Sequence, residues 1–437
     1  MAIFKKNKKR RRSLFGIFTS FMTKFLYNNS LRLLHLVYLM ASFFHPKARQ
    51  FVEGRKGIFK RLQKAFQAKK QTLIWVHCAS LGEFEQGRPV MEELKKEFAS
   101  SKILLTFFSP SGYEVRKKFP GADHVFYLPM DTPHNARRFI EITQPVLAIF
   151  IKYEFWYNYT HELKKRNTPT LSVSSIFRPD QIFFSSYGSF FRKILSHFTY
   201  FFVQNEESVN LLKSIGITRC MQSGDTRFDR VYQIAQHRHE IPLVQSFKGT
   251  QKIFVIGSCW PEDMDVLAPF INETQLLLKF IIAPHEISEE FLAAIGKSIE
   301  CETVRFSNAE ESVLEETRVL LIDNVGMLSQ LYPYGEFAYV GGAFGKGLHN
   351  ILEAACYGVP IFFGNKNYEK FKEAKDLILR GGAFEISGFH DLKSTYEILL
   401  NRPEIFLLAC DVNRQYVLEN LGATKKILDY CHKLLTI

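Results

Sequence analysis

Two glutamates stand directly after apolar runs of the kind that form buried strands, and each could take part in acid–base or charge-stabilising chemistry. Glu83 ends the segment Ser80-Leu81-Gly82-Glu83, which follows the apolar run 73–77. A carboxylate on a tight glycine turn can accept the proton of an attacking hydroxyl. Serine followed three residues later by glutamate is also the pattern of a helix capping box, so a purely structural role for Glu83 stays open.

A second acidic residue, Glu154, lies in the aromatic segment Tyr153–Asn158 after another apolar run. A carboxylate among aromatic side chains at a strand end is a candidate for a shifted pKa and for catalysis. A surface glutamate beside core aromatics is the alternative. Arg227, in the segment Gly224–Asp229, could stabilise a leaving phosphate or an acidic sugar. A surface ion pair between Arg227 and Asp229 is the structural alternative for that residue.

The second half of the chain contains segments that suit a nucleotide. Gly257–Glu262 and Gly341–Ala355 have small residues that let backbone amides approach a phosphate. In Gly341–Ala355 a glycine-rich turn is expected to lead into a helix, with Asn350 and Glu353 on one face. Glu353 could then accept hydrogen bonds from both ribose hydroxyls, whereas a helix cap made by these two residues is the alternative. His285 could contact a base or a phosphate, or serve the structure alone.

The elements that must position these residues are short strands alternating with helices. Because helices separate the strands, the pattern predicts parallel sheets with right-handed crossovers. Ligands of such sheets bind at the carboxyl ends of the strands, where the candidate residues stand. Strands are expected at 73–77, 103–108, 125–128, 146–151, 170–174 and 200–204, and again at 252–256, 278–282, 318–322, 337–340 and 360–363.

A length of 437 residues suits two domains. The alternation of strands and helices is lost over residues 232–250, where polar residues, Pro242 and Gly249 predict a linker. The predicted fold class is α/β, with two Rossmann-like, doubly wound domains and a cleft between them. Their expected bounds are 49–235 and 250–420, with an anchor at 1–48 and a last helix, about 405–434, whose end at 421–437 returns toward the N-terminal domain.

The positive charge of the chain is concentrated at its N-terminus. Eleven of the 57 Lys and Arg residues precede Glu53, the first acidic residue, and seven lie between Lys5 and Arg12. The rest of the chain is nearly balanced, so the basic arm points to a polyanion such as an anionic membrane surface. Residues 14–44 are rich in Leu, Phe, Tyr and Met, but Leu33–Pro46 is shorter than the roughly 20 apolar residues of a spanning helix. We therefore expect an interfacial anchor, with a spanning or a buried helix as alternatives.

The seven cysteines are scattered, without a C-x-x-C pair or a Cys/His cluster. This usage favours a reducing compartment and argues against a structural zinc site. No Asp-x-Asp motif appears in an expected cleft loop, so neither a metal nor a cofactor is expected.

Taken together, these segments resemble the 3-deoxy-D-manno-octulosonic acid (Kdo) transferase family from about residue 30 to the C-terminus. Ser80–Glu83 matches the family's S-x-G-E loop, which implies that Glu83 is the proton acceptor. Tyr153–Asn158 is similar to the family's E-x-E-L-W-P-N segment, whose second acidic residue, implied to stabilise the transition state, falls on Glu154. Gly224–Asp229 is similar to G-N-L-K-F-D, with Arg227 in the place of the transition-state lysine.

The donor side of the resemblance lies in the second half of the chain. Gly257–Glu262 is similar to G-S-T-W-x-x-E, and Gly341–Ala355 matches G-G-S-F-x-x-x-G-x-H-N-x-L-E-x-A. The P-R-H motif is present without its arginine, and Met327 replaces the acidic residue of D-T-x-G-E-L. The donor contacts that the resemblance implies are Pro284, His285, Val325, Gly326, Met327, Asn350, Ile351, Leu352 and Glu353.

The resemblance implies a GT-B fold, with the acceptor on the N-terminal domain and CMP-Kdo on the C-terminal one. It implies inverting transfer of Kdo to a glucosamine hydroxyl of a lipid A precursor, lipid IVA, at the cytoplasmic face of the bacterial inner membrane. The implied partners are therefore CMP-Kdo, the lipid A precursor and an anionic membrane surface, with no nucleic acid.

Two other functions remain open on the sequence. One is a GT-B enzyme that uses a UDP-sugar and a lipid acceptor; the S-x-G-E loop and the second-domain signature speak against it. The other is a non-enzymatic protein that binds a membrane or a nucleic acid through the basic arm. The near-neutral body and the absence of a recognised nucleic-acid motif count against that function.

Overall fold

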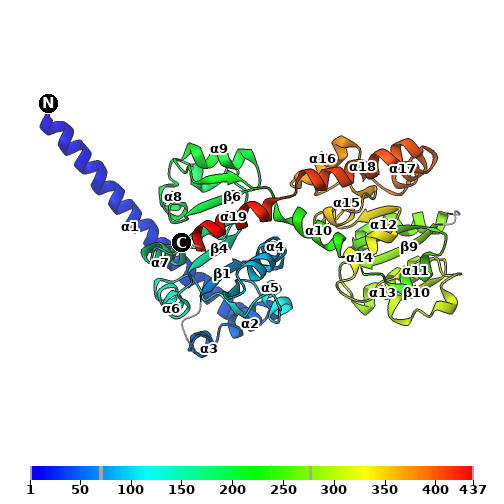
Figure 1. Ribbon diagram of the computed structural model, residues 1–437, viewed down its shortest axis with the longest axis horizontal. Coiled ribbons are helices and arrows are strands. Elements are labelled where there is room, and N and C mark those ends of the chain that lie inside the picture. Colours follow the sequence, from blue (N-terminus) through cyan, green and yellow to red (C-terminus); the bar gives the residue numbers. More distant parts are fainter. Residues whose placement is uncertain (1, 68–71, 238, 275–277, 436–437) are drawn as a thin grey trace. The chain divides into compact units, whose positions relative to one another are not determined.

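Two parallel sheets organise the chain (Figure 1). The computed structural model describes residues 2–67, 72–237, 239–274 and 278–435. Its first compact unit comprises Met1–Arg230 with Gly422–Ile437, and its second comprises Val231–Leu421. In the described part of the chain each unit contains one seven-stranded sheet, and the strand pairs are parallel. The predicted α/β class with two doubly wound domains is therefore confirmed.

The sheet of the first unit has the strand order β3-β2-β1-β4-β5-β6-β7. Because β1 lies between β2 and β4, the direction of strand succession reverses there, and ligands of such sheets bind at the carboxyl ends of the strands at this point. The strands are β1 (Leu73–Cys78), β2 (Lys102–Phe107), β3 (His124–Tyr127), β4 (Leu147–Ile151), β5 (Thr170–Ser175), β6 (Tyr200–Val203) and β7 (Cys220–Gln222).

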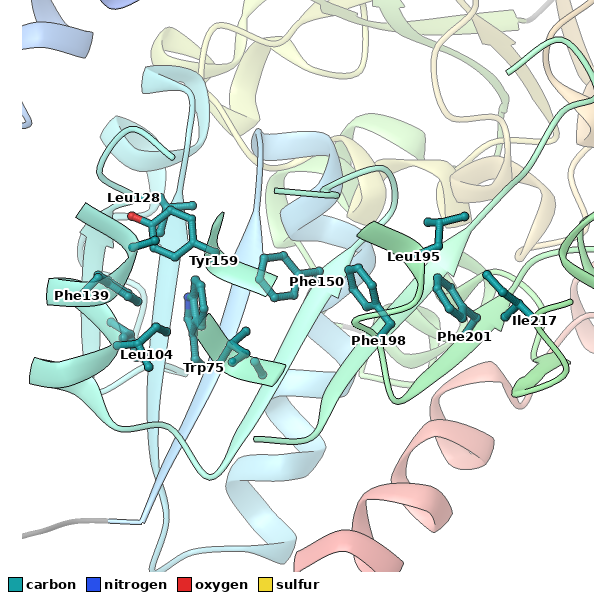
Figure 2. Close-up of a cluster of buried hydrophobic side chains, with 14 of the residues drawn as sticks. Trp75, Leu104, Leu128, Phe139, Phe150, Tyr159, Leu195, Phe198, Phe201 and Ile217 are labelled. Carbon is teal, nitrogen blue, oxygen red and sulfur yellow. The ribbon is translucent and has the colours of Figure 1, made fainter. Parts of the chain in front are cut away.

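Every residue of β1 is buried, and its side chains alternate between two hydrophobic clusters on opposite faces of the sheet. Figure 2 shows the cluster around Trp75, whose ring lies 4.9 Å from Phe139, 5.0 Å from Phe150 and 5.6 Å from Tyr159. The helices of this face are α3 (Ile58–Ala65), α6 (Pro133–Thr143), α7 (Tyr157–Lys165), α8 (Ser189–Leu195) and α9 (Glu206–Ser214). The opposite face packs against α4 (Leu81–Glu97) and α19 (Ala423–Leu435).

The second unit has the strand order β10-β11-β9-β8-β12-β13-β14, and its order reverses at β8. Phe254, Ile256 and Cys259 of β8 pack into a cluster with α12 (Pro261–Glu273), α13 (Glu289–Ser298) and α17 (Phe389–Asn401). The strands are β8 (Lys252–Cys259), β9 (Leu278–Pro284), β10 (Thr303–Arg305), β11 (Val319–Leu321), β12 (Phe337–Val340), β13 (Ile361–Gly364) and β14 (Ala383–Ile386).

The predicted linker is largely helical. It contains the end of α10 (Thr226–Gln236) and all of α11 (Pro242–Lys248), two successive helices with no strand between them among the described residues. Val244 and Phe247 of α11 are fully buried, which explains why this polar segment is nevertheless ordered as a helix. The first unit ends at Arg230 rather than at 235.

The predicted C-terminal helix is two helices. α18 (Pro403–Glu419) belongs to the second unit, and α19 belongs to the first. Gly422 separates them with a φ of 102°, a left-handed conformation that favours glycine and ends a helix. Ile427, Leu428 and Cys431 of α19 then pack into the core of the first unit.

The N-terminal segment forms α1 (Ala2–Ala41), which is followed by α2 (Pro46–Glu53) (Figure 1). The side chains of residues 1–21, including the basic run Lys5–Arg12, lie outside the described part of the structure. From residue 22 onward, many apolar side chains of α1 and its C-terminal turn are exposed, among them Phe25, Leu26, Leu33 and Phe44. Among the described residues, no helix combines the length and the apolar character needed to cross a membrane.

Candidate active site

Glu83 lies in the first turn of α4, directly after the carboxyl end of β1. Ser80 is the N-cap residue of α4, but its side chain accepts no hydrogen bond from a described backbone amide. Its hydroxyl donates a hydrogen bond to the Glu83 carboxylate instead. The reciprocal capping box suggested by the S-x-x-E spacing is therefore not what forms. The half-buried Glu83 carboxylate is oriented by a hydroxyl, as a proton acceptor at a strand end requires.

Glu154 follows β4 and is held from two sides. Trp156 donates its indole N–H to Glu154 Oε2 at 2.6 Å, and His77 Nε2 lies 3.1 Å from the same oxygen. The chain turns sharply at Lys152, whose φ of 62° is uncommon for a residue other than glycine. These contacts fix a carboxylate at the strand end next to β1, where the sheet order reverses.

His77, the last residue of the predicted strand 73–77, joins the site although no role was predicted for it. Its side chain is fully buried, and Nδ1 lies 2.9 Å from Thr106 Oγ1 and 3.1 Å from the Thr106 carbonyl oxygen. Trp75 donates to the same Thr106 hydroxyl at 2.8 Å. The Thr106 hydroxyl can donate to His77 Nδ1 or accept from it, whereas a carboxylate only accepts, so the contact with Glu154 is a hydrogen bond when Nε2 carries a proton.

Glu83 and Glu154 lie close enough together that the charges of both affect the pKa of Cys78. Burial raises the pKa of the Cys78 thiol well above its usual range, and the charges of Glu83 and Glu154 raise it further. Burial likewise raises the pKa of Tyr153, with Glu83 contributing in the same direction. Negative charge at the carboxyl edge of the first sheet therefore acts on Cys78, whereas at Tyr153 the positive charge of Arg178 opposes that of Glu83 and acts to lower the pKa.

Arg227 is the second residue of α10 and forms an ion pair with Asp225 rather than with Asp229. Its Nε and Nη2 each lie 2.9 Å from Asp225 Oδ2. Asp229 instead accepts the backbone amides of Gly422 and Thr424, at 2.7 and 2.6 Å, and so caps α19. The surface pair between Arg227 and Asp229, which was the structural alternative, does not form. Arg227 pairs instead with Asp225, on the loop that follows β7.

The Arg227 loop is tied to the helix that carries Glu83. Thr226 donates its hydroxyl to the Gln86 carbonyl at 2.6 Å, and the Gln86 amide lies 3.4 Å from Asp225. Gln86 is one turn beyond Glu83 on α4. In the first unit the structure therefore brings together the loops of Glu83, Glu154 and Arg227 at one edge of the sheet.

A buried carboxylate, Asp131, supports the segment that carries Glu154. It accepts hydrogen bonds from the Tyr27 hydroxyl at 2.6 Å and from the backbone amides of Asn158 and Tyr159 at 3.1 and 3.0 Å. Burial nevertheless raises the Asp131 pKa to about 6, because desolvation outweighs the three donors. Tyr27 belongs to α1 and also accepts the Tyr157 amide at 3.2 Å, so α1 contacts the end of the Glu154 segment.

In the second unit, three aromatic rings gather at the carboxyl ends of the strands. Trp260 follows β8 and stacks on His285, which follows β9, at 4.6 Å between ring centroids. His285 stacks in turn on His349 at 4.3 Å, and Trp260 donates its indole N–H to His349 Nε2 at 2.9 Å. Lys346 Nζ lies 3.8 Å from the centre of the Trp260 ring. Burial lowers the pKa of His349 to about 4 and also lowers that of His285, so both rings are neutral at pH 7.

The glycine-rich turn approaches the end of β8 so closely that side chains are excluded. A Cβ at Gly341 would lie 2.4 Å from the Ser258 carbonyl oxygen, and Gly342 adopts a φ of 96°. The fully buried Asp263 holds the two loops together, since it accepts the amides of Trp260 and Gly342, both at 2.8 Å. The two loops that suit a nucleotide are thereby joined at the strands where the order reverses.

The helix after this turn is shorter than predicted, because α15 (Leu352–Ala355) has only four residues and Asn350 precedes it. The Asn350 amide donates to Glu353 at 3.1 Å, and its carbonyl oxygen lies 3.4 Å from the Leu352 amide, so a weak cap and an Asn–Glu pair coexist. Ile351 and Leu352 are 1% and 0% exposed. Nucleotide contacts through their side chains are excluded, and only their backbones could make them.

The remaining predicted donor residues differ in accessibility. Pro284 is buried at the end of β9, whereas the Val325 side chain is 91% exposed in the turn before α14 (Leu328–Leu331). Gly326 adopts a φ of 98° in that turn, and Met327 is the residue before α14. Within the described ranges, no three His, Cys, Asp or Glu side chains are grouped so that they could hold a metal ion.

Comparison with known proteins identifies the family. The profile described as 3-deoxy-D-manno-octulosonic-acid transferase (kdotransferase) matches residues 56–230. The 3-deoxy-D-manno-octulosonic acid transferase of Aquifex aeolicus is 31% identical over 338 residues, which cover 75% of this chain and 86% of that protein.

Solved structures agree on the fold. UDP-GlcNAc 2-epimerase from Neisseria meningitidis has a TM-score of 0.58 at 16% identity, covering 83% of this chain and 100% of its own. A glycosyltransferase from Rickettsia africae has a TM-score of 0.54 at 12% identity, covering 84% of this chain and 99% of its own. These structures support the GT-B architecture alone, whereas the sequence match carries the assignment: the chain belongs to the 3-deoxy-D-manno-octulosonic acid transferase family.

Proposed function

We propose that this protein transfers Kdo from CMP-Kdo to a glucosamine hydroxyl of a lipid A precursor, with inversion at the anomeric carbon. Family membership supports the sugar and the reaction class. The observation that carries the proposal is the Glu83 carboxylate, held by Ser80 at the carboxyl end of β1. We assign the acceptor to the first unit and the donor to the second.

The chemistry follows from the residues at each edge. As the bond between the sugar and CMP breaks, the anomeric carbon gains positive character, and the acceptor hydroxyl attacks it from the opposite side. Glu83 takes the hydroxyl proton, while the Glu154 carboxylate stabilises the developing positive charge. Arg227 stabilises negative charge on the departing phosphate or on the Kdo carboxylate, and its bidentate contact with Asp225 fixes its position.

The donor is assigned to the edge where Trp260, His285 and His349 meet. His349 Nε2 accepts from Trp260, which leaves its Nδ1–H as a donor toward a phosphate or a base. We assign the ribose hydroxyls to Glu353, whose carboxylate accepts the Asn350 side-chain amide at 3.1 Å. Pro284, His285, Val325, Gly326 and Met327 complete the proposed donor surface together with the backbone of Ile351 and Leu352.

We also propose that the protein works at the cytoplasmic face of the inner membrane. The exposed apolar side chains of α1, with Lys24 and Arg32 on the same helix, suit the surface of an anionic membrane. The lipid acceptor is present at that surface. No metal or cofactor is assigned a role, so we expect turnover to be unchanged in EDTA.

The test is a transfer assay with CMP-Kdo and a tetraacylated lipid A precursor, in which the parent is compared with Glu83→Gln. The amide has nearly the shape of the carboxylate but cannot accept the proton, so turnover should fall at least about 100-fold. Equilibrium binding of CMP should change by less than twofold, because the nucleotide is assigned to the second unit. Activity retained by Glu83→Gln would remove Glu83 as the base, and product formed only from UDP-sugars would overturn the donor assignment.

A further inference from the structure

A cavity of about 480 Å³ in the first unit has a strongly cationic lining. α1, α3, α6 and the segment after β3 form its walls. Arg32, Arg55, Lys60 and Arg138 line it, and no Asp or Glu is among its described lining residues. Its volume is in the range of small-molecule sites, about 300–1,000 Å³. A cavity with this lining suits an anion.

Arg55 is the fixed charge of this cavity. Its guanidinium donates to the carbonyls of Leu128, Phe51 and Phe108 at 2.9, 3.0 and 2.7 Å and stacks on the Phe51 ring at 3.7 Å. Burial lowers the Arg55 pKa to about 10, which leaves the side chain charged at pH 7. Carbonyl oxygens satisfy its N–H groups without cancelling its charge, although buried charges are usually paired. No carboxylate contacts Arg55 among the described residues.

The other cations are also held without anions. The Arg138 guanidinium lies 4.5 Å from the centre of the Phe59 ring, which also lines the cavity. Arg32 contacts only the Asn29 amide oxygen, at 3.5 Å, in the described part of the chain. Positive charge therefore accumulates in a lining that contains no described acidic side chain; the buried Asp131, between Met130 and Thr132, accepts its hydrogen bonds from Tyr27, Asn158 and Tyr159 instead. His35 also lines the cavity, and its buried Nδ1 has no hydrogen-bond partner among the described residues.

The cavity is lined by residues that follow the carboxyl end of β3, at the edge of the sheet that carries the candidate catalytic residues. These residues are Pro129, Met130 and Thr132, and Arg55 reaches the carbonyl that follows β2. The order β3-β2-β1-β4 places β3 two strands from β1, roughly 10 Å at about 4.8 Å per strand. A molecule that extends along this edge can meet both the cavity and Glu83.

We propose that this cavity binds a phosphate group of the acylated acceptor while the reacting hydroxyl of the same molecule faces Glu83. The proposal rests on the transfer reaction proposed above and names a second recognition point for its acceptor. Charge selects the phosphate, while Leu31, Ile58 and Met130 offer apolar walls to the adjoining acyl chains. Phosphate on a membrane phospholipid has the same chemistry, so the experiment separates the two sources.

The test compares two double variants on the same two helices. Lys60→Gln/Arg138→Gln removes two charges from the cavity, whereas Lys64→Gln/Arg137→Gln removes two exposed charges outside its lining. Both variants keep most of the side-chain volume, and equal melting temperatures confirm that both fold. Michaelis constants are measured for the tetraacylated precursor with its phosphates and for the same precursor after their enzymatic removal.

The cavity variant should raise KM for the phosphorylated acceptor at least about tenfold, because it loses two charged contacts with the phosphate. Its kcat and its KM for CMP-Kdo should change less than twofold. On the dephosphorylated acceptor, parent, cavity variant and control should have KM values within twofold of one another. An equal rise in the control, or an equal loss on the dephosphorylated acceptor, would overturn the proposal.

Two further measurements separate the remaining outcomes. If the cavity variant keeps its acceptor KM but no longer binds phosphatidylglycerol vesicles, the cavity binds a membrane headgroup and the acceptor proposal fails. If the parent transfers no Kdo, equilibrium binding of the phosphorylated and dephosphorylated precursor is measured directly. A preference for the phosphorylated form that only the cavity variant loses supports the site without the reaction, and no preference in the parent overturns it.

Discussion

At the scale of single residues, the candidate carboxylates are held by very different partners. Ser80 holds Glu83 from within the same turn, whereas Glu154 depends on His77 from a neighbouring strand. The His77 ring is buried and is oriented by Thr106 on β2. A side chain fixed on both ring nitrogens can hold a carboxylate in one orientation, so His77 is a positioning residue for Glu154.

We predict that His77→Gln lowers kcat about ten- to a hundredfold while both KM values change less than twofold. The amide can keep one contact but not the chain from Thr106 to Glu154. In a Glu154→Gln background the same change should cost little more, because residues that act as one unit are not additive. Transfer kinetics of the two single variants and the double variant measure this coupling. Independent, multiplicative losses would show that His77 acts through something other than Glu154.

The strand-end positions of Glu83 and Glu154 could be predicted because long apolar runs mark buried parallel strands. His77 and Asp131 could not be found in this way, since their partners are remote in sequence. The hydrogen bond from the Tyr27 hydroxyl to Asp131 and the contact between His77 and Glu154 form only after the chain has folded. The roles carried from the family to the site residues remain predictions.

At the scale of elements, apolar runs predicted the central strands, and the missed strands have a common reason. β7, β10 and β14 are sheet elements with partly exposed residues, and β7 and β10 have only three residues each. Such short segments lack a periodic signal. The helix α11 was missed because only Val244 and Phe247 bury apolar surface in an otherwise polar segment.

The helix α1 also supports the Glu154 segment through one hydroxyl. We predict that Tyr27→Phe destabilises the protein by about 1–3 kcal/mol, because a buried Asp131 oxygen loses a donor. It should also lower kcat, since the start of α7 loses a contact. Tyr38→Phe is the matched control on the same helix, because Tyr38 stacks on Phe51 and its hydroxyl makes no hydrogen bond in the described residues.

Urea unfolding and the transfer assay would measure both effects of Tyr27→Phe. Equal losses in Tyr27→Phe and Tyr38→Phe would mean that the tyrosine ring, rather than the contact with Asp131, matters on this helix.

At the scale of the whole molecule, exposed apolar side chains are concentrated on α1 and the turn after it. We predict that Phe25→Ser/Leu33→Ser lowers binding to phosphatidylglycerol-containing vesicles at least about tenfold, because each side chain is about 60% exposed and free to enter the interface. The control Val115→Ser/Leu379→Ser removes exposed apolar groups elsewhere and should bind as the parent does. Vesicle flotation provides the measurement, and equal flotation of all three proteins would refute the anchor.

The return of α19 to the first unit affects how the chain must fold during synthesis. The first unit is discontinuous, because the whole second unit is made between Arg230 and Gly422. Until residues 423–435 leave the ribosome, the part of the sheet face that receives Ile427, Leu428 and Cys431 lacks α19, while α4 packs elsewhere on that face. The nascent first unit therefore carries an open apolar surface while nearly two hundred further residues are translated. Chaperone demand should peak in that interval, and a ribosome stalled before Gly422 would present an incomplete N-terminal core.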